Sequence, residues 1–416
     1  MAKRKISKKT QREIEKVAKK HPWLVVVAFI LVLVMATLCL LHYKRVVTFP
    51  FLEGIIPQES VDNGGDGNDV TGVGGNFTNQ DIQTISSSNL SIHFLELGNK
   101  FTGDCTLIKV GNTEVLIDAG SIQASASTIN AYLENFCTDG VLEYVVATHA
   151  HEDHIAGLVG KKVNKVYNGV LYTYQIGTLI HFGEQTNYTA YNENNNLTLY
   201  GKYLEAVEYA KGRGTNVYTA LDCWNNTNGA SRSFDLGQGV SLSVLYQKYY
   251  VEKMANDENE YSVCTLLKDG TRNYLFTGDL ERHGEASLVE SNDLPKCVLY
   301  KGGHHGSPTS STAELLAEIQ PEMVCVCCCC GSTEYTSDMA NVFPSQAFVD
   351  RVAPYTDQIY VTTIVADNED GFASMNGNIV LYVENGELKL RCSNNATKFK
   401  DTDWFKNNRI MPNAWK

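Results

Sequence analysis

Residues 145–158 read VVATHAHEDHIAGL, an apolar run followed directly by three histidines and an aspartate. These polar residues are His149, His151, Asp153 and His154. The whole chain of 416 residues has only 10 histidines, so three within six positions are unexpected in a merely solvated loop. Imidazole and carboxylate are the ligands that borderline divalent cations such as Zn²⁺ prefer. The spacing directs His149 and His151 to one point and Asp153 and His154 to a second, which predicts a site for two metals.

Two further strand ends carry side chains of the same kind. Asp279 ends the expected strand RNYLFTGD, where one carboxylate can bridge two metals. His304 and His305 follow the expected strand CVLY, in the sequence HHGS. Taken alone, the aspartate is also typical of a turn and the histidines of a surface loop. Because they share the strand-to-loop setting of the first motif, we expect them to converge on it.

The order of elements predicts the fold class. The segments 90–97, 105–110, 114–120 and 143–149 have the composition of strands, with turns at Gly98-Asn99 and Gly111-Asn112. Helical spacing occurs at residues 127–137, and more strands and helices alternate toward the C-terminus. Two mixed sheets with helices outside fit this order better than one doubly wound parallel sheet. We therefore expect an α/β protein.

The motifs together resemble a known family. The series GDCTLI…LIDAG, THAHEDHIAGL, LFTGDLE and KGGHHGSPTSS is similar to the metallo-β-lactamase superfamily. It is most similar to the extracellular hydrolase domain of ComEC-like DNA-uptake proteins, over roughly residues 90–390. The resemblance implies a four-layered αβ/βα sandwich with two Zn²⁺ ions, or Mn²⁺ as an alternative, at one edge between the sheets.

The resemblance also assigns roles to residues. It implies a ligand set of histidines and carboxylates: His149 and His151 for the first metal, Asp153 and His154 for the second, Asp279 as the bridge, and one of His304 and His305 to complete the second site. The other histidine of that pair is left to contact substrate or donate a proton, so Asp153, His304 and His305 are the expected catalytic residues. Asp118 is expected to support the metal loop through hydrogen bonds. Lys301 and Ser307 are expected to contact a phosphate. A third histidine for the first metal is missing, and only His181 lies in the interval where one would be expected.

Such a site suits hydrolysis, because two metals can share a hydroxide and stabilise an oxyanion. We expect a phosphodiesterase or nuclease that acts on DNA or on a phosphate-bearing polymer. The alternatives are a phosphocholine- or teichoic-acid-type esterase of the cell envelope and a non-catalytic scaffold that a metal stabilises. No feature of the sequence indicates an obligate protein partner.

A second feature concerns the membrane. Pro22 to Leu41 contains about twenty residues without a charge, enough helix to cross roughly 30 Å of hydrocarbon. Nine Lys and Arg precede this segment, and only Lys44 and Arg45 follow it closely. The positive-inside rule then predicts a single-pass membrane protein with a cytoplasmic N-terminus and an extracellular catalytic domain.

The expected organisation is a basic tail (1–21), a transmembrane signal anchor (22–42), a flexible linker (43–89), the hydrolase domain (90–393) and a C-terminal tail (394–416). The linker is rich in Gly, Asn, Asp and Ser and lacks apolar periodicity. The formal net charge is −12 although the first 21 residues are basic, so the body is strongly acidic. Such a body is poorly suited to extended nonspecific contacts with nucleic acid.

The chain has 12 cysteines, and five of them lie in VCVCCCCG at residues 324–331. Neighbouring residues of a strand point to opposite faces, so adjacent cysteines pair poorly as disulfides. A metal-binding cluster is the alternative. We favour a buried strand that uses cysteine as a small apolar residue.

Overall fold

The computed structural model describes residues 77–254, 257–366 and 371–416. The expected basic tail, the membrane anchor and most of the linker lie outside these residues. Within the described part, no helix is both long enough and apolar enough to span a bilayer. All the elements below belong to one compact unit, Thr71–Lys416.

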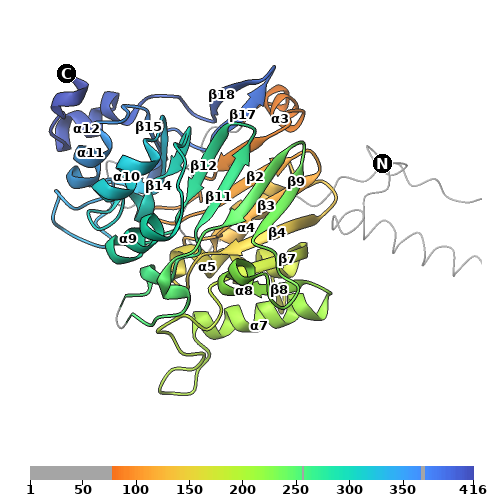
Figure 1. The fold of residues 1–416 in the computed structure, drawn as a ribbon. Helices are drawn as coiled ribbons and strands as arrows, with labels where there is room; N and C mark the ends of the chain where they lie inside the picture. Colours follow the sequence, from red (N-terminus) through yellow and green to blue (C-terminus); the bar gives the residue numbers. More distant parts are fainter. Residues whose placement is uncertain (1–76, 255–256, 367–370) are drawn as a thin grey trace, which may run out of the picture. The chain divides into compact units, whose positions relative to one another are not determined.

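Two eight-stranded mixed sheets form the centre of this unit (Figure 1). The first sheet contains, in spatial order, β18 (Glu387–Cys392), β17 (Ile379–Glu384), β1 (Ser91–Phe94), β2 (Thr106–Val110), β3 (Thr113–Ile117), β4 (Val141–Ala147), β7 (Gln175–His181) and β8 (Asn216–Thr219). From β18 to β3 the neighbouring strands are antiparallel, and from β3 to β8 they are parallel.

The second sheet has a similar plan. It contains, in spatial order, β16 (Phe372–Ser374), β15 (Ile359–Val365), β14 (Val324–Cys330), β13 (Leu299–Lys301), β12 (Arg272–Phe276), β11 (Thr265–Asp269), β10 (Val240–Val244) and β9 (Ser233–Gly237). Strands β12 to β15 run parallel, and the outer pairs are antiparallel. A short hairpin, β5 (Lys162–Val163) and β6 (Val166–Tyr167), stands apart from both sheets.

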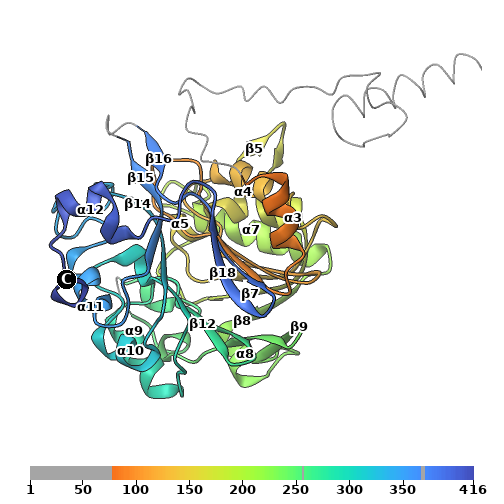
Figure 2. The same cartoon turned by 90° about the horizontal axis from the view of Figure 1, so that it is seen from above.

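One core lies between the sheets, and helices cover their outer faces (Figures 1 and 2). Phe94 of β1 and Phe276 of β12 meet in this core with ring centroids 6.4 Å apart. Four helices pack beside the first sheet: α4 (Ser125–Leu133), α5 (Glu152–Val159), α6 (Val170–Thr173) and α7 (Leu199–Gly212). Helices α9 (Arg282–Ser291), α10 (Ala313–Ile319) and α11 (Gln346–Val352) pack beside the second. This is the layered order of helices and mixed sheets that the sequence predicts.

The cysteine-rich segment forms β14, and every residue of this strand is buried. Cys325 and Cys327 belong to the core between the sheets, whereas Cys328 and Cys330 face the helices of the second sheet. Every cysteine in the described residues is a free thiol. The prediction of a buried apolar strand is therefore confirmed.

Two boundaries expected from the sequence need correction. The linker was expected to reach residue 89, but Asn79–Ser86 form α3, with a capping box between Thr78 and Asp81. Ile85 of this helix is buried in the core because its turn packs on the first sheet. The expected C-terminal tail also packs on the body, through Phe399 and through Phe405 of α12 (Asp403–Asn408). The remaining helix, α8 (Ala220–Asn225), follows β8 directly.

Candidate metal centre

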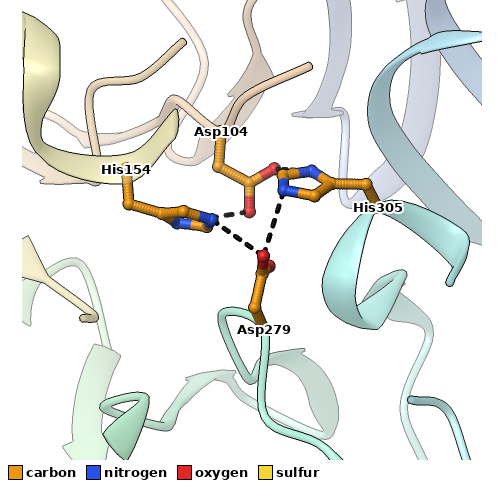
Figure 3. Close-up of side chains that lie close together, drawn as sticks. All are labelled: Asp104, His154, Asp279 and His305. Atoms are coloured by element: carbon orange, nitrogen blue, oxygen red, sulfur yellow. Dashed lines mark ion pairs between the residues drawn. The ribbon is translucent and has the colours of Figure 1, made fainter. Parts of the chain in front are cut away.

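The candidate centre lies where parallel strands of both sheets end. In the first sheet, Asp118 follows β3, and the loop after β4 leads to His154 in α5. In the second sheet, Asp279 follows β12, and His305 follows β13. Because parallel strands end at the same edge of a sheet, residues far apart in sequence meet here. Figure 3 shows His154, Asp279 and His305 converging together with Asp104.

Four side chains present ligand atoms at separations that suit one cation. Asp279 Oδ2 lies 3.0 Å from His154 Nε2 and 3.1 Å from His305 Nε2 (Figure 3). Asp153 Oδ2 is 3.2 Å from His305 Nε2, and Asp153 Oδ1 is 4.0 Å from His154 Nε2. Atoms that each lie about 2.1 Å from one cation are within ~4.2 Å of each other. The separations therefore place His154, Asp279 and His305 around one candidate cation position. Asp104 completes the group, whose ligand atoms all lie within 4.8 Å of one another, and Asp153 lies beside it.

The hydrogen bonding of these atoms supports the same conclusion. His154 Nε2, His305 Nε2 and Asp279 Oδ2 are buried and have no hydrogen-bond partner in the described structure. Buried polar atoms almost always have a partner, because leaving one unpaired costs roughly 1–3 kcal/mol. A divalent cation would satisfy all three atoms at once. The residues present thus fit a metal.

The other ring nitrogens hold the two imidazoles in the required orientation. His154 Nδ1 donates to Asp118 Oδ2 at 2.8 Å, and His305 Nδ1 donates to the carbonyl of Cys327 at 2.7 Å. With the proton on Nδ1, the lone pair of Nε2 is free for a metal. Asp118 also accepts from the Thr148 amide at 2.8 Å and from its hydroxyl at 2.7 Å, so this carboxylate supports the metal loop at its start.

The pair His304-His305 separates into two different positions. Both residues have left-handed backbone conformations, with φ of 46° and 55°. His305 is fully buried in the centre. The His304 side chain is 21% exposed; its Nε2 is 4.0 Å from Asp279 Oδ2, and its Nδ1 is 3.0 Å from Glu281 Oε1. His305 therefore lies inside the buried cluster, and His304 lies at its more exposed side.

Asp104 is the member of the cluster that sequence reasoning missed. It lies two residues before β2, is 3% exposed, and places Oδ1 3.3 Å from His305 Nδ1. Its backbone amide donates to the carbonyl of Asp153 at 3.0 Å, which joins it to the metal loop. The motif GDCTLI could have identified Asp104 as a candidate, because it places an acidic residue at the start of a strand that is expected to be buried.

The sequence suggested that Lys301 and Ser307 contact a phosphate. In the structure, both side chains are engaged by other groups of the protein. Lys301 is 3% exposed, and its ammonium contacts Asp104, Asp279 Oδ1 at 3.3 Å and the carbonyl of Gly278 at 3.0 Å. These acceptors take up its three donors. The hydroxyl of Ser307 bonds Thr309 Oγ1 at 2.6 Å and closes the local turn. Both side chains serve the protein itself.

The histidines expected at the first metal lie beside this cluster. His149 Nε2 and His151 Nδ1 are 3.0 Å apart, and the His149 ring packs on the His154 ring at 4.1 Å. His149 is buried, and His151 is half-buried. His181 lies elsewhere, with Nδ1 3.3 Å from the hydroxyl of Tyr203, in the wall of a separate cavity of about 540 Å³.

The electrostatics of the centre keep its carboxylates ionised. Burial acts to raise the pKa of Asp279, but the charges of His154, His305 and Lys301 hold it well below the ordinary value. Burial holds the pKa of His149 well below its ordinary value, and the neighbouring His154 and His151 act in the same direction. Burial acts to lower the pKa of His154 and of His305, but the charge of Asp279 and the other carboxylates raise both pKa values well above the ordinary value. A cation bound at Nε2 of these rings would therefore displace a proton from each.

Comparison with known proteins agrees with this geometry. Residues 98–187 match the profile of the metallo-beta-lactamase superfamily. This segment belongs to the metallo-β-lactamase superfamily. It includes the strands β2, β3, β4 and β7 and the whole loop from His149 to His154, whereas Asp279 and His305 lie beyond it. The match thus covers the segment that carries the histidine loop, and the cluster adds a candidate metal centre to it.

Two curated relatives match over short segments. Recombination protein 2 of Haemophilus influenzae is 30% identical over 21% of this chain and 11% of its own length. ComE operon protein 3 of Bacillus subtilis is 32% identical over 16% of this chain and 8% of its own length. The chain thus matches only about a tenth of the length of each relative.

Solved structures that match part of this chain include the metallo-beta-lactamase fold protein YhfI from Bacillus subtilis and the short form of human tRNase Z. The first has 11% identity and a TM-score of 0.35, covering 66% of this chain and 96% of that protein. The second has 13% identity and a TM-score of 0.35, covering 71% of this chain and 99% of that protein.

Proposed function

We propose that this chain is a membrane-anchored, outward-facing phosphodiesterase that uses Zn²⁺ or Mn²⁺ at the centre. The observation that carries the proposal is the set of buried, unpaired ligand atoms on His154, His305 and Asp279. Similarity over short segments to a recombination protein and a competence-operon protein favours a nucleic-acid phosphodiester. The membrane location rests on the apolar segment 22–41 and the basic residues before it.

The residues of the centre have separable tasks in such a reaction. A bound divalent cation would polarise a phosphoryl oxygen and lower the pKa of a water molecule. Asp153 accepts a hydrogen bond of 2.9 Å from Tyr335, which fixes its carboxylate. His304 is the more exposed histidine of its pair, and Glu281 holds its ring, so it is suited to contact substrate or donate a proton to the leaving oxygen.

The acidic body limits the kind of substrate. Extended DNA binding is driven by the counterions that are released when Lys and Arg side chains neutralise phosphates. An acidic body has few such side chains to spare, so it gains little from this effect. An enzyme that touches only a few phosphates around the metals avoids this difficulty. We therefore propose a preference for small phosphodiesters, with slower cleavage of single-stranded DNA.

The experiment is a hydrolysis panel with the purified chain, with and without chelator. The panel contains a bis-aryl phosphate, single-stranded DNA, a phosphocholine ester and a β-lactam. Asp279→Asn should lower phosphodiester hydrolysis by roughly 10²-fold and release at least one metal, because the bridging charge is lost. His283→Ala is the matched control, since that side chain is 69% exposed. Hydrolysis of the β-lactam or the phosphocholine ester without any phosphodiester cleavage would overturn the proposal.

A further inference from the structure

We propose that the cavity lined by His181 is a binding site for a nucleobase. Its volume of about 540 Å³ lies in the range of small-molecule sites. Its wall combines residues from β7, β8, α7 and α8, which lie side by side (Figure 1), with the segment 182–185 and Tyr250. This inference rests on the proposed function and names the part of a nucleotide that the metal centre does not hold.

The cavity lies next to the metal loop because two parallel strands end at the same edge of the first sheet. His181, the last residue of β7, pairs in register with Ala147, the last residue of β4, and His149 follows two residues later. Paired strands are about 4.8 Å apart. The segment after β7 also returns to the loop, since the ring of Tyr188 lies 6.0 Å from the ring of His151. A base attached to a phosphate at the centre is therefore within reach of the cavity.

The interior of the cavity is aromatic and uncharged. Phe182, Tyr200 and Tyr250 contribute aromatic rings to the wall, and none of them is more than 9% exposed. Burial lowers the pKa of His181 to about 4, so its imidazole is neutral at physiological pH. The acidic and basic residues of the wall are exposed, and water screens their charges. Such a lining favours a flat, uncharged, aromatic ligand.

Polar atoms of the wall lack partners among the described residues. The hydroxyl of Tyr203 lies 3.3 Å from His181 Nδ1 and has no other hydrogen bond there, so it donates to Nδ1 and leaves Nε2–H as a free donor. The hydroxyl of Tyr200 has no hydrogen bond to a described residue although Tyr200 is only 9% exposed. Gln185 Oε1 is buried and unpaired. Buried polar atoms almost always have a partner, so these atoms indicate a ligand with both donors and acceptors.

A nucleobase fits this set better than an aromatic side chain of a protein. The edge of a base presents donors and acceptors in the plane of its ring, whereas the indole of tryptophan offers a single donor and phenylalanine offers none. Stacking on a base also does not require phosphate charges to be neutralised. It therefore suits an acidic body, which is poorly suited to extended phosphate contacts.

The test is the binding of adenosine and thymidine to the full-length chain, purified in detergent with a chelator present. These nucleosides carry a base but no phosphate, so their binding does not require the metal centre. Saturation-transfer NMR detects weak complexes, with ribose as the control that lacks a base and indole as the control for a protein side chain. We expect saturable binding of at least one nucleoside, with a Kd that changes less than about twofold between low and high salt. The proposal is overturned if neither nucleoside binds, or if ribose or indole binds as tightly.

Variants locate the bound nucleoside. Tyr200→Leu should weaken binding at least about fivefold, because a stacking ring is lost. Tyr209→Leu is the matched control, since Tyr209 also belongs to α7 but is 46% exposed and lies outside the wall. His181→Phe keeps a flat ring and removes the Nε2–H donor, and it should weaken binding by roughly three- to tenfold.

Circular dichroism identifies any variant that fails to fold. Leu204→Trp, at a half-buried residue of the wall, then takes its place, because the larger ring fills the cavity and should block binding. Nucleoside binding that is unchanged in all folded variants of the wall would exclude this cavity as the site.

These measurements are independent of the proposed activity. Nucleoside binding without phosphodiester cleavage would overturn the proposed function and leave this inference standing. Phosphodiester cleavage without nucleoside binding would have the opposite meaning.

Discussion

At the scale of single residues, the hydrogen bond on one nitrogen of each imidazole determines the use of the other. His154 and His305 both donate from Nδ1, to Asp118 and to a backbone carbonyl, and both keep Nε2 free. His304 differs from its neighbour because its Nδ1 meets Glu281 at the mouth of the centre. Adjacent residues of the same type therefore have different roles.

The supporting role of Asp118 leads to a prediction. In Asp118→Asn, the side-chain NH2 group can face His154 Nδ1 and donate a hydrogen bond to it. This arrangement favours the histidine tautomer with the proton on Nε2. That tautomer cannot bind a metal through Nε2, so metal affinity should fall by roughly 10- to 100-fold. Calorimetric titration of the variant with Mn²⁺ measures this change. Asp293→Asn, at an exposed position, is the matched control, and equal affinities for the two variants would contradict the assigned role.

At the scale of elements, a buried carboxyl group connects the two sheets. Glu96 follows β1 in the first sheet, and both its oxygens lie 2.8 Å from the hydroxyl of Ser374 in β16 of the second sheet. The amide of Glu96 also donates to the side chain of Asn378 at 2.9 Å. This carboxyl group is 6% exposed, so its protonation state is linked to how well the sheets pack.

Burial raises the pKa of Glu96 to about 7, although the hydrogen bond from Ser374 opposes the shift. Below its ordinary value of 4.5 the group is protonated in both the folded and the unfolded chain. As the pH rises from 4.5 through 7, the unfolded chain ionises first, so the folded state loses up to roughly 3 kcal/mol of stability. Glu96→Gln should flatten the dependence of Tm on pH in this range. Glu318→Gln, at an exposed position, should retain it; the same slope in both variants would contradict the assignment.

At the scale of the whole molecule, the centre exists only when both sheets are packed together. Asp118 and His154 come from the first sheet, and Asp279 and His305 from the second. A metal held between them also links the two halves, so metal binding stabilises the folded body by mass action.

The proposed location is also a property of the whole chain. If the N-terminus is cytoplasmic and residues 22–42 cross the membrane, protease added to intact cells should degrade the catalytic body. The measurement is immunoblotting of a C-terminal epitope before and after lysis, with a cytoplasmic protein as control. A body that is protected in intact cells and cut only after lysis would reverse the proposed orientation.

The sequence by itself determined the features that depend on local pattern. The candidate ligands of the first motif lie within six consecutive residues, 149–154. The composition of the strands and the order of elements predicted two mixed sheets, and the cysteine-rich composition predicted that β14 is buried. A continuous apolar run predicts a strand buried on both faces, and β14 is such a strand.

Only the tertiary structure decided the features that depend on long-range contact. Asp104 and Lys301 meet although almost 200 positions separate them, and neither residue carries a local signal of that contact. His304 and His305 both have left-handed backbone angles, and only the tertiary structure shows that their rings contact different partners, Glu281 and the carbonyl of Cys327. Helix α3 was hidden in a polar segment, because the burial of Ile85 against the first sheet outweighs a composition typical of a linker. Contacts of this kind depend on packing between elements, which residue spacing along the chain does not encode.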